Sequence, residues 1–165
     1  MKLLGIDFGE RRIGLAISDP EGRVAVPLTA LERSSDRAAV ARIAELARRE
    51  GVGGLVVGEP LGLDGERGAA AERARRFAER LAAATGLPWE AVDEALTSVE
   101  AGARLREAGV DPRRHPGRVD AVAAQIVLQE ALDRRRAAAA RTAASGGEPG
   151  RPAAGEPSDP GGAGS

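Results

Sequence analysis

The sequence predicts an α/β fold in which a five-stranded mixed sheet carries helices on both faces. Three strand-like runs separated by turns open the chain, as in an antiparallel meander, and helical and strand-like patterns alternate after them. The length of 165 residues suits one domain with a substantial core. These observations favour a single α/β domain over an all-helical or all-strand architecture.

The first three strands are expected at 2–7, 12–19 and 23–31. Each run is rich in apolar and β-branched residues. Turn signals separate them, at Gly9 and at the Asp-Pro-Glu-Gly run of 19–22. Short connections of this kind join antiparallel neighbours.

The rest of the chain alternates helices with strands and ends in two helices. A serine at 34 or 35 can cap the first helix, and Phe77 and Leu81 lie one turn apart on the second. The run from Thr97 to Glu100 has the spacing of a capping box, which starts the third helix. The expected elements are a helix at 36–50, a strand at 54–58, a helix at 66–84, a strand ending near Asp93, a helix from Thr97 to Gly109 and a helix at 119–136. The predicted order is βββαβαβαα.

A change in composition divides the chain near residue 136. Residues 137–165 consist mainly of Ala, Gly, Pro, Ser and Glu, with almost no large apolar side chain. Such a segment does not bury enough surface to offset the entropy of ordering it. We therefore expect one folded domain at 1–136 and a disordered tail at 137–165.

Composition excludes several classes of function. The chain has no cysteine and one histidine, His115, so thiolate and multi-histidine zinc sites are excluded. It lacks a long apolar span and an N-terminal signal pattern, which predicts a cytoplasmic protein without a membrane partner. The net charge is −1, but a basic segment from Arg104 to Arg118 could hold a polyanion.

Acidic residues stand at the ends of several apolar elements. Asp7 ends the first strand, Glu59 follows the fourth, Asp93 and Glu94 end the fifth, and Asp120 opens the last helix. If these ends meet at one edge of the sheet, the carboxylates repel one another unless cations join them. Oxygen ligands of this kind suit Mg²⁺ or Mn²⁺, and two such ions about 4 Å apart can cleave phosphodiesters.

Each acid also has a structural interpretation. Asp7 can close a tight turn beside Gly9, and Glu59 can be a solvated loop residue. Only one of Asp93 and Glu94 can face a common pocket, because neighbouring side chains on a strand alternate. Asp120 in a first helical turn would be stabilised by the helix dipole, by about 0.3–1 kcal/mol.

The chain resembles the YqgF (RuvX) family, pre-16S rRNA nucleases of the RNase H-like superfamily that are also described as Holliday-junction-resolvase-like. The resemblance covers residues 2 to about 136 and rests on four motifs in order. The motifs are Gly5-Ile6-Asp7-Phe8-Gly9 with Arg12-Ile13-Gly14, Val56-Val57-Gly58 through Pro60 with Asp64-Gly65, Asp93-Glu94 with Leu96-Thr97-Ser98, and Arg118-Val119-Asp120 with Ala123-Ala124 and Leu128-Gln129.

The resemblance implies an RNase H-like sheet with the first strand central. It implies that Asp7, Glu94 and Asp120 bind metal and are catalytic, with Glu59 or Asp93 as a further candidate ligand. Two departures stand out: Ala95 replaces an arginine that is usual in the family, and Glu59 occupies a position that is usually apolar. An arginine at 95 would have offered a cation to a phosphate or an acid.

The nucleic-acid-binding residues are expected beside the acids. Arg12, Arg113, Arg114 and Arg118 are candidates for phosphate contacts, and Thr97 is a helix cap first and a substrate contact second. For Arg113, Arg114 and Arg118, a solvated charged loop is the competing interpretation.

The function expected from these patterns is a two-metal nuclease that hydrolyses phosphodiester bonds. The resemblance implies 5′-end processing of pre-16S rRNA in ribosome biogenesis, with structured RNA or branched DNA as substrate and ribosomal precursor particles as partners. The alternatives are a noncatalytic RNA-binding assembly factor, a Holliday-junction-resolvase-like DNA nuclease and, ranked lower, an actin-like ATPase, because the Asp-Phe-Gly hairpin also resembles the phosphate-binding hairpin of that fold.

Overall fold

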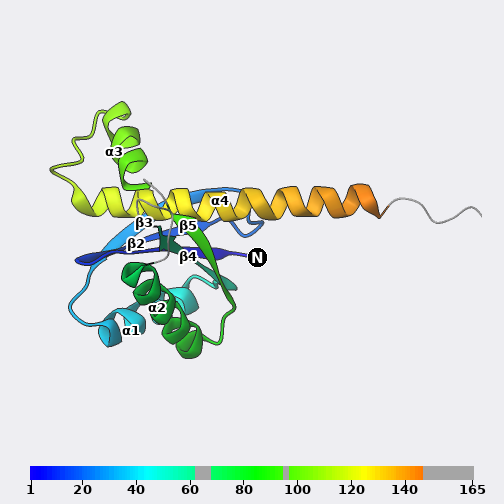
Figure 1. Ribbon diagram of the computed structural model, residues 1–165, viewed down its shortest axis with the longest axis horizontal. Coiled ribbons are helices and arrows are strands. Elements are labelled where there is room, and N and C mark those ends of the chain that lie inside the picture. The colour runs from blue at the N-terminus through cyan, green and yellow to red at the C-terminus, as the bar shows by residue number, and fades with distance from the viewer. Residues whose placement is uncertain (62–67, 95–96, 147–165) are drawn as a thin grey trace, which may run out of the picture.

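The computed structural model describes residues 1–61, 68–94 and 97–146 of the chain. Nine elements follow one another in the predicted order βββαβαβαα (Figure 1). They are β1 (Leu3–Phe8), β2 (Arg12–Ser18), β3 (Ala25–Glu32), α1 (Asp36–Arg49), β4 (Gly54–Pro60), α2 (Ala69–Thr85), β5 (Trp89–Glu94), α3 (Thr97–Glu107) and α4 (Pro116–Ser145).

The five strands form one mixed sheet with the order β3-β2-β1-β4-β5. The pairs β1/β2 and β2/β3 are antiparallel, and β1/β4 and β4/β5 are parallel. The expectation of a mixed sheet with a central first strand is therefore confirmed. Because β1, β4 and β5 are parallel, their carboxyl ends lie at the same edge of the sheet, where ligand sites of α/β folds usually occur.

Helices cover both faces of the sheet, as predicted (Figure 1). Helices α1 and α2 lie on one face, where Ile6, Val57 and Phe77 belong to one buried apolar cluster. Helix α4 lies on the other face, and Val56 and Leu128 belong to a second cluster there. Helix α3 packs on α4 through a smaller cluster around Leu105.

Local sequence accounts for the boundaries of these helices. Ser35 caps α1 by accepting a hydrogen bond from the amide of Ala38, and Gly86 ends α2 in the left-handed conformation that glycine adopts without strain. The expected start of the second helix, Glu66, lies outside the described residues. No helix in the described ranges is both long enough and apolar enough to traverse a bilayer.

Helix α4 is longer than the sequence pattern predicted. It begins at Pro116 rather than Val119, because proline fits the first helical position, where no amide donor is needed. It continues past Arg136 to Ser145 and projects from the body of the protein (Figure 1). Alanine has the highest helix propensity and accounts for the extension. The predicted tail boundary at residue 137 thus falls inside this helix, and residues 147–165 lie outside the described part.

Candidate active site

Three acids from distant parts of the sequence meet where the parallel strands end. Asp7 lies near the end of β1, Glu94 ends β5, and Asp120 lies on α4. Asp7 follows Ile6, whose side chain packs in the apolar cluster under α1 and α2, so the side chain of Asp7 points to the opposite face. Glu94 lies two residues after Val92, which belongs to the cluster under α4, so these two side chains share a face. Both side chains therefore lie on the face that α4 covers.

The acids are close enough to perturb one another. The pKa of Asp7 is raised to about 8, first by burial and then by the charge of Glu94, a hydrogen bond with Glu94 and the charge of Asp120. Without a cation, Asp7 therefore keeps its proton at neutral pH. A carboxyl group that is protonated at pH 7 is typical of functional sites, where like charges are held together.

Two polar partners orient the other acids. The Nε atom of Arg12, at the start of β2, lies 2.6 Å from Oδ2 of Asp120 and donates a hydrogen bond to it. The hydroxyl of Thr97 donates a short hydrogen bond to Oε1 of Glu94. Arg12 was expected to contact nucleic acid, and its pairing with Asp120 could not be read from a separation of 108 residues.

Two glycines make the cluster sterically possible. A Cβ atom on Gly58 would collide with Oε2 of Glu94 and would lie 3.1 Å from Cγ2 of Val127. A Cβ atom on Gly14 would collide with the main-chain carbonyl of Asp120. Gly58 leaves room for one carboxylate, and Gly14 lets the backbone of α4 rest on β2. Both glycines belong to the motifs of the sequence, but this packing role was not predicted.

Glu59 and Asp93 are not brought to the cluster. Glu59 is only 3% exposed, and both of its carboxylate oxygens lie 3.2 Å from Nη2 of Arg75 on α2. Asp93 is exposed and precedes Glu94 on β5, so it faces the opposite side. Both candidates for an additional ligand are thus directed to the α1/α2 face, because neighbouring residues on a strand alternate. Trp89 lies under the same arginine, with its ring centroid 5.9 Å from Cζ of Arg75.

Two expectations about helix starts need correction. Thr97 is the first residue of α3, and its hydroxyl is directed to Glu94 rather than to a backbone amide of its helix. Asp120 is not in the first turn of α4, because the helix begins four residues earlier. Stabilisation by the helix dipole therefore does not explain why an acid stands at position 120. Asp64 and Ala95 lie outside the described residues.

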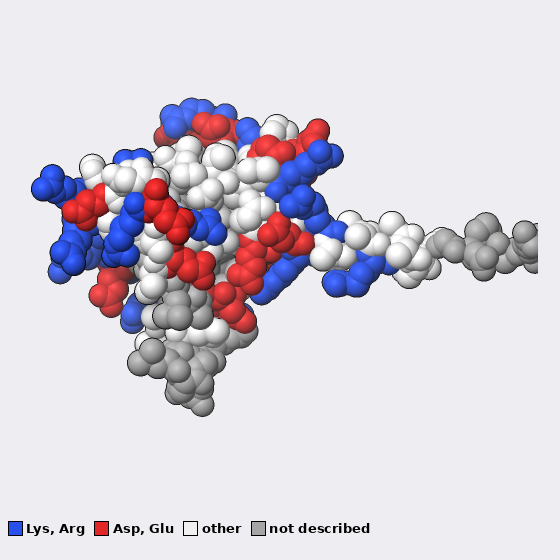
Figure 2. Space-filling view, turned by 90° about the horizontal axis from the view of Figure 1, so that it is seen from above, with Lys and Arg blue, Asp and Glu red and all other residues white. Residues whose placement is uncertain are grey.

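The predicted phosphate-binding arginines divide into two groups. Arg113 and Arg114 lie in the exposed connection between α3 and α4, where Asp111 accepts a hydrogen bond from the amide of Arg113 and lies 3.9 Å from Nε of Arg114. Arg118 lies on α4 with His115 at its start, and both line a cavity outside the acid cluster. Basic side chains gather at the end of the molecule where α4 begins (Figure 2).

Comparison with known proteins places this chain in a family. A family model described as "RuvX: Holliday junction resolvase" matches residues 1–134. The chain belongs to the RuvX family. Relatives named "Putative pre-16S rRNA nuclease" include one from Anaeromyxobacter sp. (strain Fw109-5), 50% identical over 137 residues, which are 83% of this chain and 100% of the relative. Another, from Chloroflexus aurantiacus, is 47% identical over 134 residues, which are 81% of this chain and 88% of the relative.

Solved structures agree on the fold. RuvC from T. thermophilus, in complex with a Holliday junction substrate, superimposes with a TM-score of 0.56 over 83% of this chain and 96% of that chain. The sequences are 20% identical, so this likeness shows the fold alone. The region that matches the RuvX model contains Asp7, Glu94 and Asp120.

The acid cluster suits a divalent cation by its chemistry. Three carboxylates offer the hard oxygen ligands that Mg²⁺ and Mn²⁺ prefer, and the pKa of Asp7 is raised by burial and by the charges of Glu94 and Asp120, both of which a dication would offset. In their present positions, no three His, Cys, Asp or Glu side chains among the described residues form a ready ligand set. Arg12 occupies one oxygen of Asp120, so a cation would bind the other oxygen of this carboxylate or displace the guanidinium.

Proposed function

We propose that this RuvX-family protein is a metal-dependent nuclease that hydrolyses phosphodiester bonds in pre-16S rRNA, at the 5′ end, during ribosome biogenesis. The observation that carries the proposal is the meeting of Asp7, Glu94 and Asp120 at the ends of β1 and β5 and on α4. The names of the relatives support rRNA as the substrate. Cytoplasm is the compartment in which this substrate would be met.

The three carboxylates would hold one or two Mg²⁺ or Mn²⁺ ions, which supply an activated water and stabilise the departing oxygen of the phosphodiester. Asp7 must first lose the proton that it keeps because of its burial and its acidic neighbours. The released proton goes to solvent, and the resulting carboxylate is an oxygen ligand. Asp7 thus couples cation binding to deprotonation.

Thr97 and Arg12 are positioning residues in this proposal. Thr97 holds Glu94 through its hydroxyl, which fixes the direction of the carboxylate. Arg12 holds Asp120 and brings a positive charge to the same edge of the sheet. Were a cation to take its place on Asp120, this guanidinium would be free to pair with a phosphate of the substrate, as a planar donor suited to phosphate oxygens.

The test compares cleavage of a pre-16S rRNA fragment by the wild-type protein, Asp7→Asn and Asp93→Asn. With Mg²⁺ or Mn²⁺, we expect the wild type and Asp93→Asn to cut the RNA, and we expect Asp7→Asn and any sample with EDTA to be inactive. Asp93 is the matched control, since it is an acid on the same sheet that faces away from the cluster. Unchanged metal-dependent cleavage by Asp7→Asn would contradict the proposal.

A DNA-junction nuclease is the second candidate, favoured by the description of the family model. The same assay separates the two when a four-way DNA junction replaces the RNA. Faster cleavage of the junction than of the RNA would favour the DNA substrate. A noncatalytic assembly factor is distinguished by calorimetry, because a protein without a metal site gives no heat on addition of Mn²⁺.

A further inference from the structure

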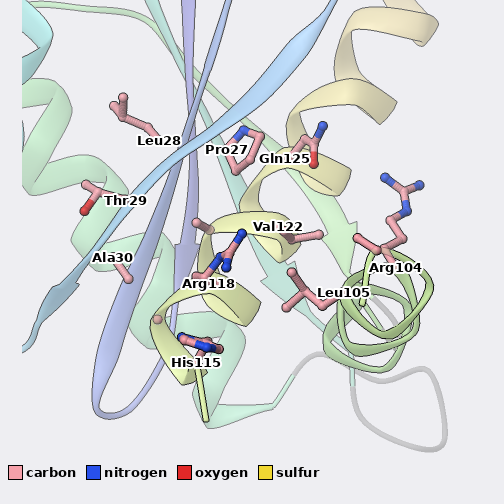
Figure 3. A pocket seen from close by; sticks show the side chains of 13 residues that line it. Pro27, Leu28, Thr29, Ala30, Arg104, Leu105, His115, Arg118, Val122 and Gln125 are labelled. Carbon is pink, nitrogen blue, oxygen red and sulfur yellow. The ribbon is translucent and has the colours of Figure 1, made fainter. Parts of the chain in front are cut away.

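A groove of about 730 Å³ lies beside the first turns of α4 (Figure 3), and its lining includes none of the three acids. Residues 27–30 of the edge strand β3 form one wall, and Arg104 and Leu105 of α3, with Ala108 just after it, contribute the opposite wall. The first turns of α4 form the floor. Gln125 on α4 links the floor to β3 by donating a hydrogen bond of 3.0 Å to the carbonyl of Ala25.

The groove carries positive charge without acidic compensation. Arg104 comes from α3, Arg118 and His115 come from α4, and none of the described lining residues is an acid. Both arginines are exposed, and within the described ranges neither takes part in an ion pair. The chain offers these two guanidinium groups to an anion from outside.

The remaining lining is apolar with a few hydrogen-bonding groups. Pro27, Leu105 and Val122 supply apolar surface, and Gln125 supplies polar atoms (Figure 3). A ligand that matches this lining has anionic groups beside flat or apolar parts. A nucleotide chain has this chemistry, since phosphates alternate with sugars and bases.

The groove and the acid cluster share one helix. Arg118 and Asp120 are two residues apart on α4, which places them about 3 Å apart along the helix axis and about 200° around it. Asp120 faces the sheet, and Arg118 faces the groove. A strand that passes over the start of α4 would therefore reach the groove within a few nucleotides of the acids.

We propose that this groove binds a single-stranded segment of the nucleic-acid substrate next to the bond that is cut, with Arg104 and Arg118 on its phosphates. The inference rests on the proposed nuclease function for the identity of the ligand. It assigns a second contact region to the substrate, beside the first turns of α4.

The first test measures binding without cleavage. A fluorescently labelled RNA about 12 nucleotides long is titrated with protein in EDTA, and anisotropy gives the affinity. We expect the double variant Arg104→Ala/Arg118→Ala to bind at least about tenfold more weakly. The slope of log affinity against log salt should fall by about 1.4, since each lost phosphate contact on a single strand removes about 0.7.

The matched control removes two arginines elsewhere. Arg37 on α1 and Arg73 on α2 are exposed, lie on the helices of the other face and take part in no ion pair within the described part of the chain. The variant Arg37→Ala/Arg73→Ala has the same net charge as the groove variant and should bind RNA as the wild type does. Equal affinities for the two double variants would overturn the proposal.

A second pair of variants fills the groove without changing charge. Pro27→Trp places an indole in the groove, because Pro27 pairs with Ala16 on the face that α4 covers, whereas Val26→Trp places one on the opposite face of the same strand. Only Pro27→Trp should weaken RNA binding, and circular dichroism checks that both fold. The binding and cleavage assays test the two proposals separately. If the wild type cleaves RNA and the groove variants bind RNA as well as the wild type, the groove proposal is wrong and the nuclease proposal stands. If the groove variants bind RNA more weakly but the wild type does not cleave it, the nuclease proposal is wrong.

Discussion

Replacing Asp7 by asparagine should stabilise the metal-free protein by an amount that grows with pH. Burial and the neighbouring acids raise the pKa of Asp7 from 3.8 to about 8. Between these two pH values the unfolded chain has lost a proton that the folded protein keeps, so the folded state binds more protons and stability falls as pH rises. The contribution is fully present below about pH 4 and is lost as pH approaches 8.

The magnitude follows from the pKa. Each pH unit in this window lowers the free energy of unfolding by up to about 1.4 kcal/mol, which accumulates to on the order of 5 kcal/mol at pH 8. Asparagine cannot ionise, and its amide can still donate to Glu94. The stability difference between Asp7→Asn and the wild type should therefore widen from about pH 4 to about pH 8 and level off above it.

Urea unfolding followed by circular dichroism in EDTA measures this difference at each pH. Asp93→Asn is the control, because Asp93 is exposed on the opposite face and its substitution should leave the pH dependence unchanged. Mg²⁺ should restore stability to the wild type, by about 2.7 kcal/mol at one hundred times its Kd, and should leave Asp7→Asn nearly unaffected. A gap between the variants that does not change with pH would refute the reasoning.

Three further predictions follow from the same edge of the sheet. Gly58→Ala should lower the cleavage rate at least about tenfold, because the added Cβ atom displaces the carboxylate of Glu94, while Tm changes by only a few degrees. Gly68→Ala is the control in the same assay, because a Cβ atom at Gly68 meets open space. Arg75→Met should lower the free energy of unfolding by about 1–3 kcal/mol in urea titrations, because it removes a donor from the buried Glu59, and Glu59→Gln in that background should recover part of the loss. Mg²⁺ affinity should rise by up to about tenfold per pH unit between about pH 6 and pH 8, and calorimetry in two buffers should detect about one released proton; binding without proton release would contradict a protonated acid in the site.

The fold could be predicted because its signals are local. Turn residues, strand-like runs and helical spacing gave the order of elements, and short connections made neighbours of the first three strands. The end of α4 was missed because the prediction of a disordered tail rested on its lack of apolar side chains to bury. The nine residues beyond Arg136 are instead helical through the intrinsic propensity of alanine. The start of α4 was missed by three residues, although Pro116 carries a recognisable signal for a first helical position.

The candidate site was predictable only in part. The sequence indicated that acids end several strands, and alternation required that one of Asp93 and Glu94 face away. Alternation alone does not tell which face α4 covers; Glu94 was chosen through the family resemblance, and the placement of Glu59 and Asp93 on the other face needed the structure. The pair formed by Arg12 and Asp120 joins elements whose contact depends on how the last helix crosses the sheet, and no local pattern carries that information.

The contact between Gly14 and the main chain of α4 restricts how this protein can be engineered. Thermal stabilisation often replaces glycines in strands with β-branched residues. At this position any side chain would push the whole helix away from the sheet and carry Asp120 away from its two acidic neighbours. Stabilising substitutions should therefore be sought on α1 and α2, where added bulk leaves the spacing of the three carboxylates intact.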